Sequence, residues 1–305
     1  MPNIACPKCG FEEPESATEC ARCGVVFNKI VADRRPQERE HGRAGLPVLH
    51  SSRAPWNIIL FGLTAAIVAY AIPLTRMMFS AIVTLFHEFG HAVVGWLMGM
   101  PSIPAFDFTY GGGITPHGAF HLSIALAVAA AFGYAIWFFR DNLRLTILLA
   151  ASALVWLVFV TADWRREFIF SAGGHLGECI LAGILFWMAL SGTGWRSPEI
   201  ERPLGAFVAF FVQINMIFFC RRLINDPDFL DWYRQGKGGA LMNDLENIAL
   251  DLHIHTRFNP GIQGVARMLL LFSFVPLIVA VLLYLWPQLN LLTSADAAQA
   301  DGSGG

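Results

Sequence analysis

Charged residues are scarce in this chain of 305 residues: they make up 14% of it, whereas soluble domains carry about a quarter. The formal net charge is only −2, so no global charge favours nucleic acid as a partner. Hydrophobic residues account for 55% of the chain, in runs too long and too numerous for a soluble protein of this length to bury. The composition therefore predicts an integral membrane protein surrounded by a lipid bilayer.

Cysteine is also scarce, with six in all, and no apolar signal segment precedes the four that cluster near the N-terminus. These four form two Cys-x-x-Cys-Gly turns, with the cysteines at Cys6, Cys9, Cys20 and Cys23. Two such turns can surround one tetrahedral zinc ion, so we predict a structural zinc ribbon over 1–30. The ribbon favours a reducing, cytoplasmic location and suggests a cytoplasmic protein partner.

Seven apolar runs follow a polar linker that covers 31–55. The runs fall at about 56–73, 78–99, 119–139, 144–162, 168–190, 204–220 and 264–286. Each approaches the roughly 20 residues that a helix needs to cross the hydrocarbon core of a bilayer. The predicted fold class is therefore an all-α polytopic membrane protein with about seven transmembrane helices, in a domain over 56–290 that precedes a disordered tail over 291–305.

Basic residues are distributed unevenly between the loops that join these runs. If the N-terminus is inside, 16 of the 21 Lys and Arg residues fall on inside segments and the other 5 on outside loops. Inside loops of membrane proteins are enriched in Lys and Arg, so the bias favours a cytoplasmic N-terminus and a C-terminus on the opposite side. The segment 223–262 is then cytoplasmic.

A short polar segment between the second and third runs has a different pattern. Residues 106–110 alternate between apolar and polar side chains, and three glycines follow at 111–113. Alternation is typical of a strand and consecutive glycines of a turn. We therefore expect a β-hairpin that lies against the membrane.

The second apolar run contains the sequence His87-Glu88-Phe89-Gly90-His91. Positions i and i+4 share one face of a helix, so the two imidazoles can bind one zinc ion, with Glu88 beside it as general base for water. Ionisable residues at this depth in a bilayer are costly, which favours a functional site over a polar cluster that only packs helices.

The motif, read as Phe86-His87-Glu88-Phe89-Gly90-His91-Ala92 and followed by the glycine-bearing hairpin, resembles the site-2 protease family of intramembrane zinc metalloproteases. The resemblance covers mainly residues 79–120. It implies that His87 and His91 are zinc ligands, that Glu88 is catalytic, and that the hairpin presents substrate as an added strand. The family's third ligand is an aspartate in a Leu-Asp-Gly motif, and here no Asp-Gly precedes an apolar run.

The third ligand therefore remains open between two carboxylates. Glu178 lies in the fifth run at a depth similar to that of the His motif, one turn after His175. Asp244 lies in the polar segment between the sixth and seventh runs, which could fold back toward the metal. The structural alternatives are a helix-packing hydrogen bond for Glu178 and a helix N-cap for Asp244. Weaker candidates are His175, Asp226 and Asp228.

These features predict an intramembrane zinc endopeptidase that cuts a membrane-embedded or juxtamembrane segment of a protein substrate. One catalytic and one structural zinc ion are expected. The alternative is a non-proteolytic membrane adaptor or metal sensor that retains the zinc motif. A metal transporter is less favoured, because the sequence lacks the internal repeat and the paired broken helices that such folds usually show.

Overall fold

The structure is a computed structural model, and it divides the chain into two units, Met1–Val48 and Leu49–Gly305. It describes residues 3–5, 12–14, 17–20, 55–107, 112–235 and 242–286. In the first unit, β1 (Asn3–Ala5) pairs antiparallel with β2 (Glu12–Pro14), and Cys20 is buried. The other three ribbon cysteines, the tail over 291–305 and nearly all of the linker lie outside the described residues. The zinc ribbon therefore stays a prediction.

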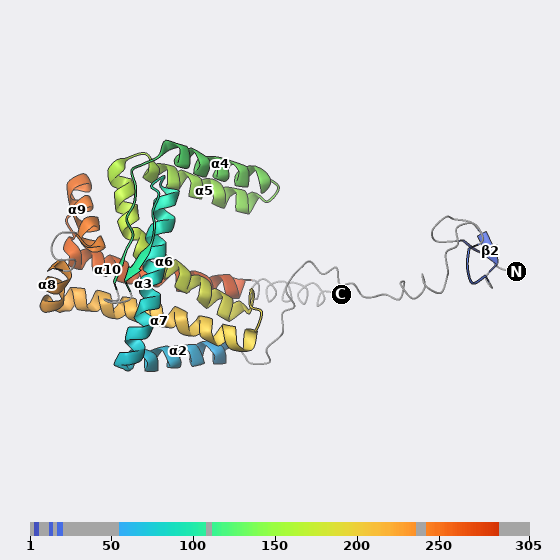
Figure 1. The fold of residues 1–305 in the computed structure, drawn as a ribbon, viewed down its shortest axis with the longest axis horizontal. Coiled ribbons are helices and arrows are strands. Elements are labelled where there is room, and N and C mark those ends of the chain that lie inside the picture. The colour runs from blue at the N-terminus through green and yellow to red at the C-terminus, as the bar shows by residue number, and fades with distance from the viewer. Residues whose placement is uncertain are drawn as a thin grey trace, which may run out of the picture. The chain divides into compact units, whose positions relative to one another are not determined.

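The second unit is mostly helical, with one small sheet (Figure 1). Its helices are α2 (Pro55–Ala71), α3 (Pro73–Leu97), α4 (Leu122–Phe138), α5 (Leu143–Val160), α6 (Asp163–Ser191), α7 (Pro198–Asn225), α8 (Pro227–Gln235), α9 (Asp244–Thr256) and α10 (Gly261–Ser273). A helical segment continues from the end of α10 to Trp286, after a turn at Phe274.

Five of these helices are long and apolar enough to cross a membrane: α3, α5, α6, α7 and the segment Gly261–Trp286. The chain is thus a membrane-embedded protein. Helices α2 and α4 have 17 residues each. At 1.5 Å per residue they are about 26 Å long, somewhat less than the roughly 30 Å of hydrocarbon in a bilayer. Seven helices coincide with the seven apolar runs, but seven crossings remain a prediction.

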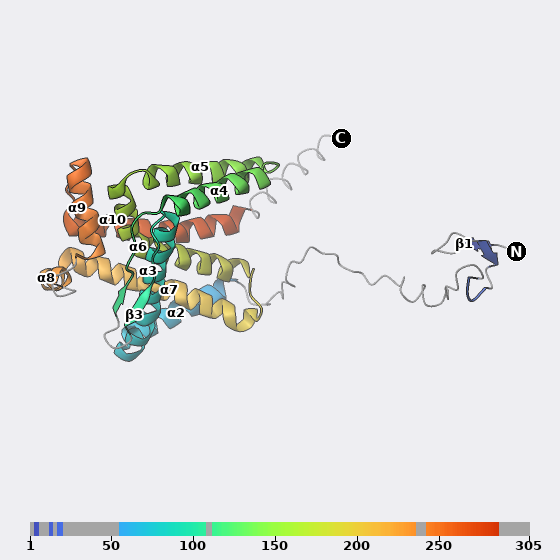
Figure 2. The same cartoon turned by 45° about the horizontal axis from the view of Figure 1, so that its top comes forward.

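The boundary between the first two helices differs from the expected one. Helix α2 ends at Ala71, and α3 begins at Pro73 rather than near residue 78. Proline fits the first position of a helix, and it disfavours helical geometry at the preceding Ile72. Both views show α3 running across the direction that α2 and α7 share (Figures 1 and 2).

Helix α3 packs most extensively against α6, and glycines make the contact possible. A Cβ atom added at Gly90 would lie 2.4 Å from the carbonyl oxygen of Gly173 and 3.0 Å from Cα of Gly177. Small residues allow helix backbones in a membrane to approach this closely. Because backbone atoms occupy the space, a larger side chain at residue 90 would push the two helices apart.

The expected hairpin is present, but its glycines are placed differently from the prediction. Strand β3 (Ala105–Asp107) pairs antiparallel with β4 (Gly112–Ile114), and Phe106 faces Gly113. Gly112 and Gly113 therefore belong to the second strand and not to the turn, which falls on residues that the structure does not describe. Beyond the strands, an isolated bridge joins Ser102 to His117. Two glycines in a strand leave room for another group to approach the backbone.

The start of α6 contacts two segments that connect the longer helices. One of them carries α8 and α9, which lie near each other in both views (Figures 1 and 2). The ring of Trp164, at the start of α6, stacks on His255 of α9 with centroids 4.6 Å apart. His117, which follows the hairpin, places Nε2 3.3 Å from Oε2 of Glu167 on α6. The start of α6 thus contacts both α9 and the segment that follows the hairpin.

Candidate metal centre

Helix α3 presents His87 and His91 on one face, as their spacing predicts. The Nε2 atoms of the two rings are 3.0 Å apart, and the ring planes are nearly perpendicular. Side chains four residues apart on a helix lie one above the other, so α3 alone is sufficient to pair these rings.

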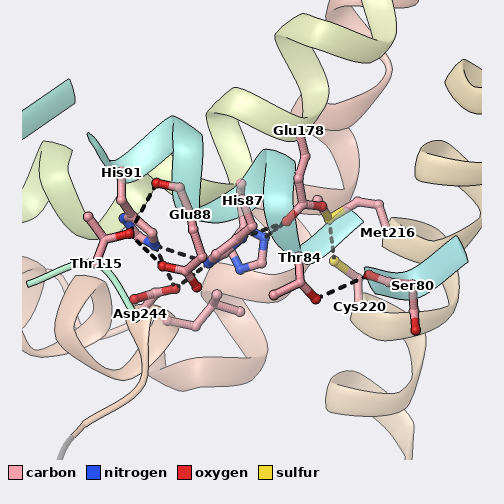
Figure 3. Close-up of polar contacts among 12 residues, drawn as sticks. Ser80, Thr84, His87, Glu88, His91, Thr115, Glu178, Met216, Cys220 and Asp244 are labelled. Carbon is pink, nitrogen blue, oxygen red and sulfur yellow. Dashed lines mark hydrogen bonds and ion pairs between the residues drawn. The ribbon is translucent and has the colours of Figure 1, made fainter. Parts of the chain in front are cut away.

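Asp244 completes a triangle with the two imidazoles (Figure 3). Its Oδ2 atom is 2.9 Å from Nε2 of His87 and 3.2 Å from Nε2 of His91. Two nitrogen or oxygen ligands of a tetrahedral zinc ion, each about 2.1 Å from the metal, are roughly 3.4 Å apart. The sides of the triangle, at 2.9, 3.0 and 3.2 Å, are slightly shorter than this value, so the three atoms could hold one metal ion.

The second nitrogen of each ring has its own partner. Nδ1 of His87 is 2.6 Å from Oε1 of Glu178, and Nδ1 of His91 is 2.7 Å from the carbonyl oxygen of Phe170. These acceptors favour the tautomer with hydrogen on Nδ1, which leaves the Nε2 lone pairs for a metal. Asp244 and Glu178, the two carboxylates that the sequence left open, therefore lie on opposite sides of His87 (Figure 3).

The start of α9 determines where Asp244 lies. Asn243 is the N-cap, and its backbone N–H donates to the Glu246 carboxylate at 2.9 Å. The Asn243 side chain donates to the carbonyl oxygen of Tyr233, and the N–H of Leu245 lies 3.4 Å from the Tyr233 hydroxyl oxygen. Asn243 thus fills the capping role that the sequence left possible for Asp244. The Asp244 carboxylate is free to face the imidazoles.

Two acid–base groups near this segment are perturbed by their surroundings. Burial acts to raise the pKa of Asp244, but hydrogen bonds from His87 and His91, with the positive charge that these rings carry when protonated, outweigh it and hold this pKa well below its usual value. Asp244 also lies at a helix N-terminus, where negative charge is favoured. Burial and the neighbouring Asp244 carboxylate raise the pKa of Tyr233. Asp244 is therefore an ionised acceptor beside a neutral phenol.

Helix α6 leaves the space in front of the imidazoles open because residue 174 is glycine. A Cβ atom added at Gly174 would lie 2.4 Å from Nε2 of His87 and 2.5 Å from Nε2 of His91. These distances are only slightly longer than a zinc–nitrogen bond of about 2.0–2.1 Å. A methyl group at residue 174 would therefore occupy the space that a metal ion needs.

Glu88 is held between α3 and the hairpin, and only 6% of its surface is exposed. The hydroxyl oxygen of Thr115 is 2.6 Å from its Oε2 atom and 3.1 Å from its backbone oxygen. A Cβ atom added at Gly113 would lie 2.4 Å from both Cγ and Oε1 of Glu88. The backbone of β4 thus lies directly against the carboxylate and fixes its direction.

A cavity of about 530 Å³ joins these groups. Helices α3, α6, α7 and α9 and the segment from Gly112 to His117 all contribute to its walls. The ionisable residues that line it are His87, Glu88, His91, His117, Glu167, His175, Glu178, Tyr233 and Asp244. Neither Asp226 nor Asp228 is among its lining residues, and the Asp226 carboxylate instead accepts the backbone N–H of Phe229.

His175 is buried beside the site, with Nδ1 3.3 Å from Oε1 of Glu178. One possible ligand atom each of His87, His175 and Asp244 lies within 4.8 Å of the others. The triangle that includes His91 in place of His175 is tighter, with all its sides at 3.2 Å or less. The tighter set matches the spacing of atoms bound to one metal.

Several contributors to the site have no signal in the sequence. They are the backbone oxygen of Phe170, the hydroxyl of Thr115 and the backbone oxygen of Tyr233. Nothing in the sequence around these residues indicates that the fold brings them to the motif. Only Gly174 has a recognisable signal, because paired glycines in an apolar run, here Gly173-Gly174, are typical of close helix approach.

Comparison with known proteins gives no relative from which a role could be transferred: no family model, no curated protein and no solved structure matches the chain.

Proposed function

We propose that this membrane-embedded protein is a zinc endopeptidase similar to the site-2 proteases, and that it hydrolyses a peptide bond in a membrane-embedded or juxtamembrane protein segment. The observation that carries the proposal is the triangle of His87 Nε2, His91 Nε2 and Asp244 Oδ2. A carboxylate that can act as base, Glu88, lines the same cavity.

The donor set fits zinc. Two imidazole nitrogens and one carboxylate oxygen form a three-ligand set that leaves a fourth tetrahedral position open, as is usual at catalytic zinc sites. We assign Asp244 as the third ligand, because Glu178 lies on the Nδ1 side of His87, away from the triangle. A zinc ion bound there would activate water and polarise a substrate carbonyl.

Glu88 is the general base in this proposal. A carboxylate in its place takes a proton from water and delivers it to the leaving amine, which typically contributes 10²- to 10⁴-fold to the rate. Its short contact with Thr115 and the adjacent backbone of Gly113 hold one orientation. Glu88 directly follows His87 on α3, so the helix holds the backbones of the proposed base and of one proposed ligand in a fixed relation.

The hairpin binds the substrate as an extended segment in this proposal. Strand β4 lies along the cavity, and a Cβ atom added at Gly112 would have nothing within 4 Å. An extended peptide can pair with a strand edge, whereas a helical segment keeps its carbonyl groups in its own hydrogen bonds. A transmembrane substrate would therefore unwind locally before cleavage.

The orientation and the N-terminal unit complete the proposal. The charge bias places the N-terminus in the cytoplasm and the C-terminus on the opposite side. The hairpin and α9 would then face the cytoplasm. We propose that a zinc ribbon over 1–30 recruits a cytoplasmic protein partner.

Substitution of Glu88 tests the reaction. Full-length protein is reconstituted in liposomes with a single-span peptide that carries a fluorophore and a quencher on opposite sides of its Gly-rich centre. Wild-type protein should cleave it in a zinc-dependent manner, and Glu88→Gln should lower the rate by at least about 10²-fold while zinc stays bound. Glu199→Gln, at an exposed site on α7, is the control.

Cleavage by the Glu88→Gln variant at the wild-type rate would show that the protease assignment is wrong. Zinc binding by the wild type without cleavage of a panel of such peptides would favour the adaptor or sensor alternative.

A further inference from the structure

Glu178 is a buried carboxylate that the proposed reaction does not use directly. Only 4% of its surface is exposed, on a helix that is long and apolar enough to lie in the membrane. An unpaired charge in such surroundings is costly, so each polar contact of the Glu178 carboxylate stabilises it appreciably. The shortest one, at 2.6 Å, joins Oε1 to Nδ1 of His87.

The two histidines of the motif differ in what holds their Nδ1 atoms. For His91 the partner is the neutral carbonyl oxygen of Phe170, and for His87 it is the charged carboxylate of Glu178. A carboxylate behind a ligating imidazole fixes its tautomer and ring orientation and makes the ligand more basic. His87 is therefore the ring that its surroundings make the stronger ligand.

A second imidazole, that of His175, lies close to the same oxygen of Glu178. Its Nδ1 is 3.3 Å from the same Oε1 atom, and its ring contacts that of His87 edge-on, with centroids 4.6 Å apart. Nδ1 of His175 is buried and finds no hydrogen bond of good geometry within the described part of the chain. Oε1 of Glu178 lies within ion-pair distance of this nitrogen, so both imidazoles lie next to the same carboxylate oxygen.

The charges around the triangle favour the same arrangement. A divalent cation there would carry two positive charges, and the carboxylates of Asp244, Glu178 and the proposed base Glu88 line the same cavity. Asp244 would neutralise the ion by direct contact, whereas Glu178 would do so through the His87 ring. Buried charges are tolerated in a low-dielectric membrane interior when groups of opposite charge lie beside them.

We infer that Glu178 is a positioning residue for the metal centre rather than a ligand: together with His175, it orients His87 and strengthens metal binding through that ring. The inference rests on the proposed function only in taking the triangle as a metal site. It does not require that the protein cleave peptides.

Metal affinity and the Co²⁺ spectrum of the full-length protein in detergent test the inference. Subtracting a His87→Ala/His91→Ala variant isolates the membrane site from metal bound by the N-terminal cysteines. Glu178→Gln should bind Zn²⁺ about 10- to 100-fold more weakly, the usual loss for a partner behind a ligand. Its Co²⁺ ligand-field bands should keep the wild-type position and intensity, because the three ligand atoms are unchanged.

Three further variants make the result specific. Glu178→Asp keeps the charge on a shorter side chain and should recover part of the affinity. Asp244→Ala removes a ligand and should change the Co²⁺ bands. Glu199→Gln should match wild type. Helix content and the thermal melting curve of each variant show whether it has folded.

Each contrary result has a distinct meaning. If Glu178→Gln alters the Co²⁺ bands as Asp244→Ala does, Glu178 is a ligand and the inference is wrong. If folded Glu178→Gln binds Zn²⁺ as tightly as wild type, Glu178 does not support His87, and the inference again fails. If wild type binds no more metal than the double His variant, the metal site itself is absent and the proposed function fails with it.

Discussion

The candidate ligands come from two regions that differ in helix length and in how they are held in place. His87 and His91 lie on α3, a 25-residue helix whose backbone is packed against that of α6. Asp244 lies at the first residue of α9, a 13-residue helix that is not among the candidate membrane spans.

The first region is fixed by helix geometry and backbone contact, which have few ways to relax. The second is held by side-chain contacts of Asn243 and Tyr233 and by the apolar face of α9, which is buried against α7, α8 and α10. Damage to the α3–α6 pair should therefore abolish the site. Loss of the polar contacts of Asn243, here called the α9 anchor, leaves the buried apolar face intact and should weaken the site by degrees.

The largest effect is expected for Gly174→Ala. The new methyl group would lie 2.4–2.5 Å from both Nε2 atoms and would take the place of the ion, so metal binding at the membrane site should be lost. Zinc content of the purified protein measures this. Gly133→Ala is the matched control, because a Cβ atom there has nothing within 4 Å. Normal zinc content in a folded Gly174→Ala protein would contradict the assigned metal position.

Gly113→Ala should have the next largest effect, on the reaction and not on the metal. Its Cβ atom would collide with Glu88 and turn the carboxylate away, so cleavage should fall by about 10²-fold or more while zinc content is kept. Gly133→Ala, on α4 and with nothing within 4 Å of the added Cβ atom, should cleave normally. Equal rates for the two variants would show that β4 does not orient the Glu88 carboxylate.

Asn243→Ala, in the α9 anchor, should have a smaller and graded effect. It removes the N-cap side chain and its bond to the Tyr233 carbonyl oxygen. Loss of a cap costs about 1 kcal/mol, equivalent to a roughly fivefold loss of zinc affinity if Asp244 must be docked to bind. Isothermal titration with Zn²⁺ measures it. A complete loss of binding would show that α9 is as indispensable as the α3–α6 pair.

Local pattern predicted most of the elements. Apolar runs marked the seven helices that coincide with them, because a run of about 20 apolar residues has few stable alternatives to a helix in lipid. Alternation around Phe106 marked the hairpin, although Gly112 and Gly113 lie in its second strand. Consecutive glycines are usually interpreted as a turn, and only the presence of Glu88 beside β4 explains the glycine at residue 113.

The sequence by itself determined that His87, Glu88 and His91 share one region of a membrane-embedded helix, because a spacing of four residues on a helix leaves no other geometry. It could not decide between Glu178 and Asp244. Both lie beside His87, but on different nitrogens, and that difference arises from the glycine-mediated crossing of α3 and α6 and from the docking of α9. The two His87 pairs join residues 91 and 157 positions apart in the sequence, and no local pattern encodes such contacts.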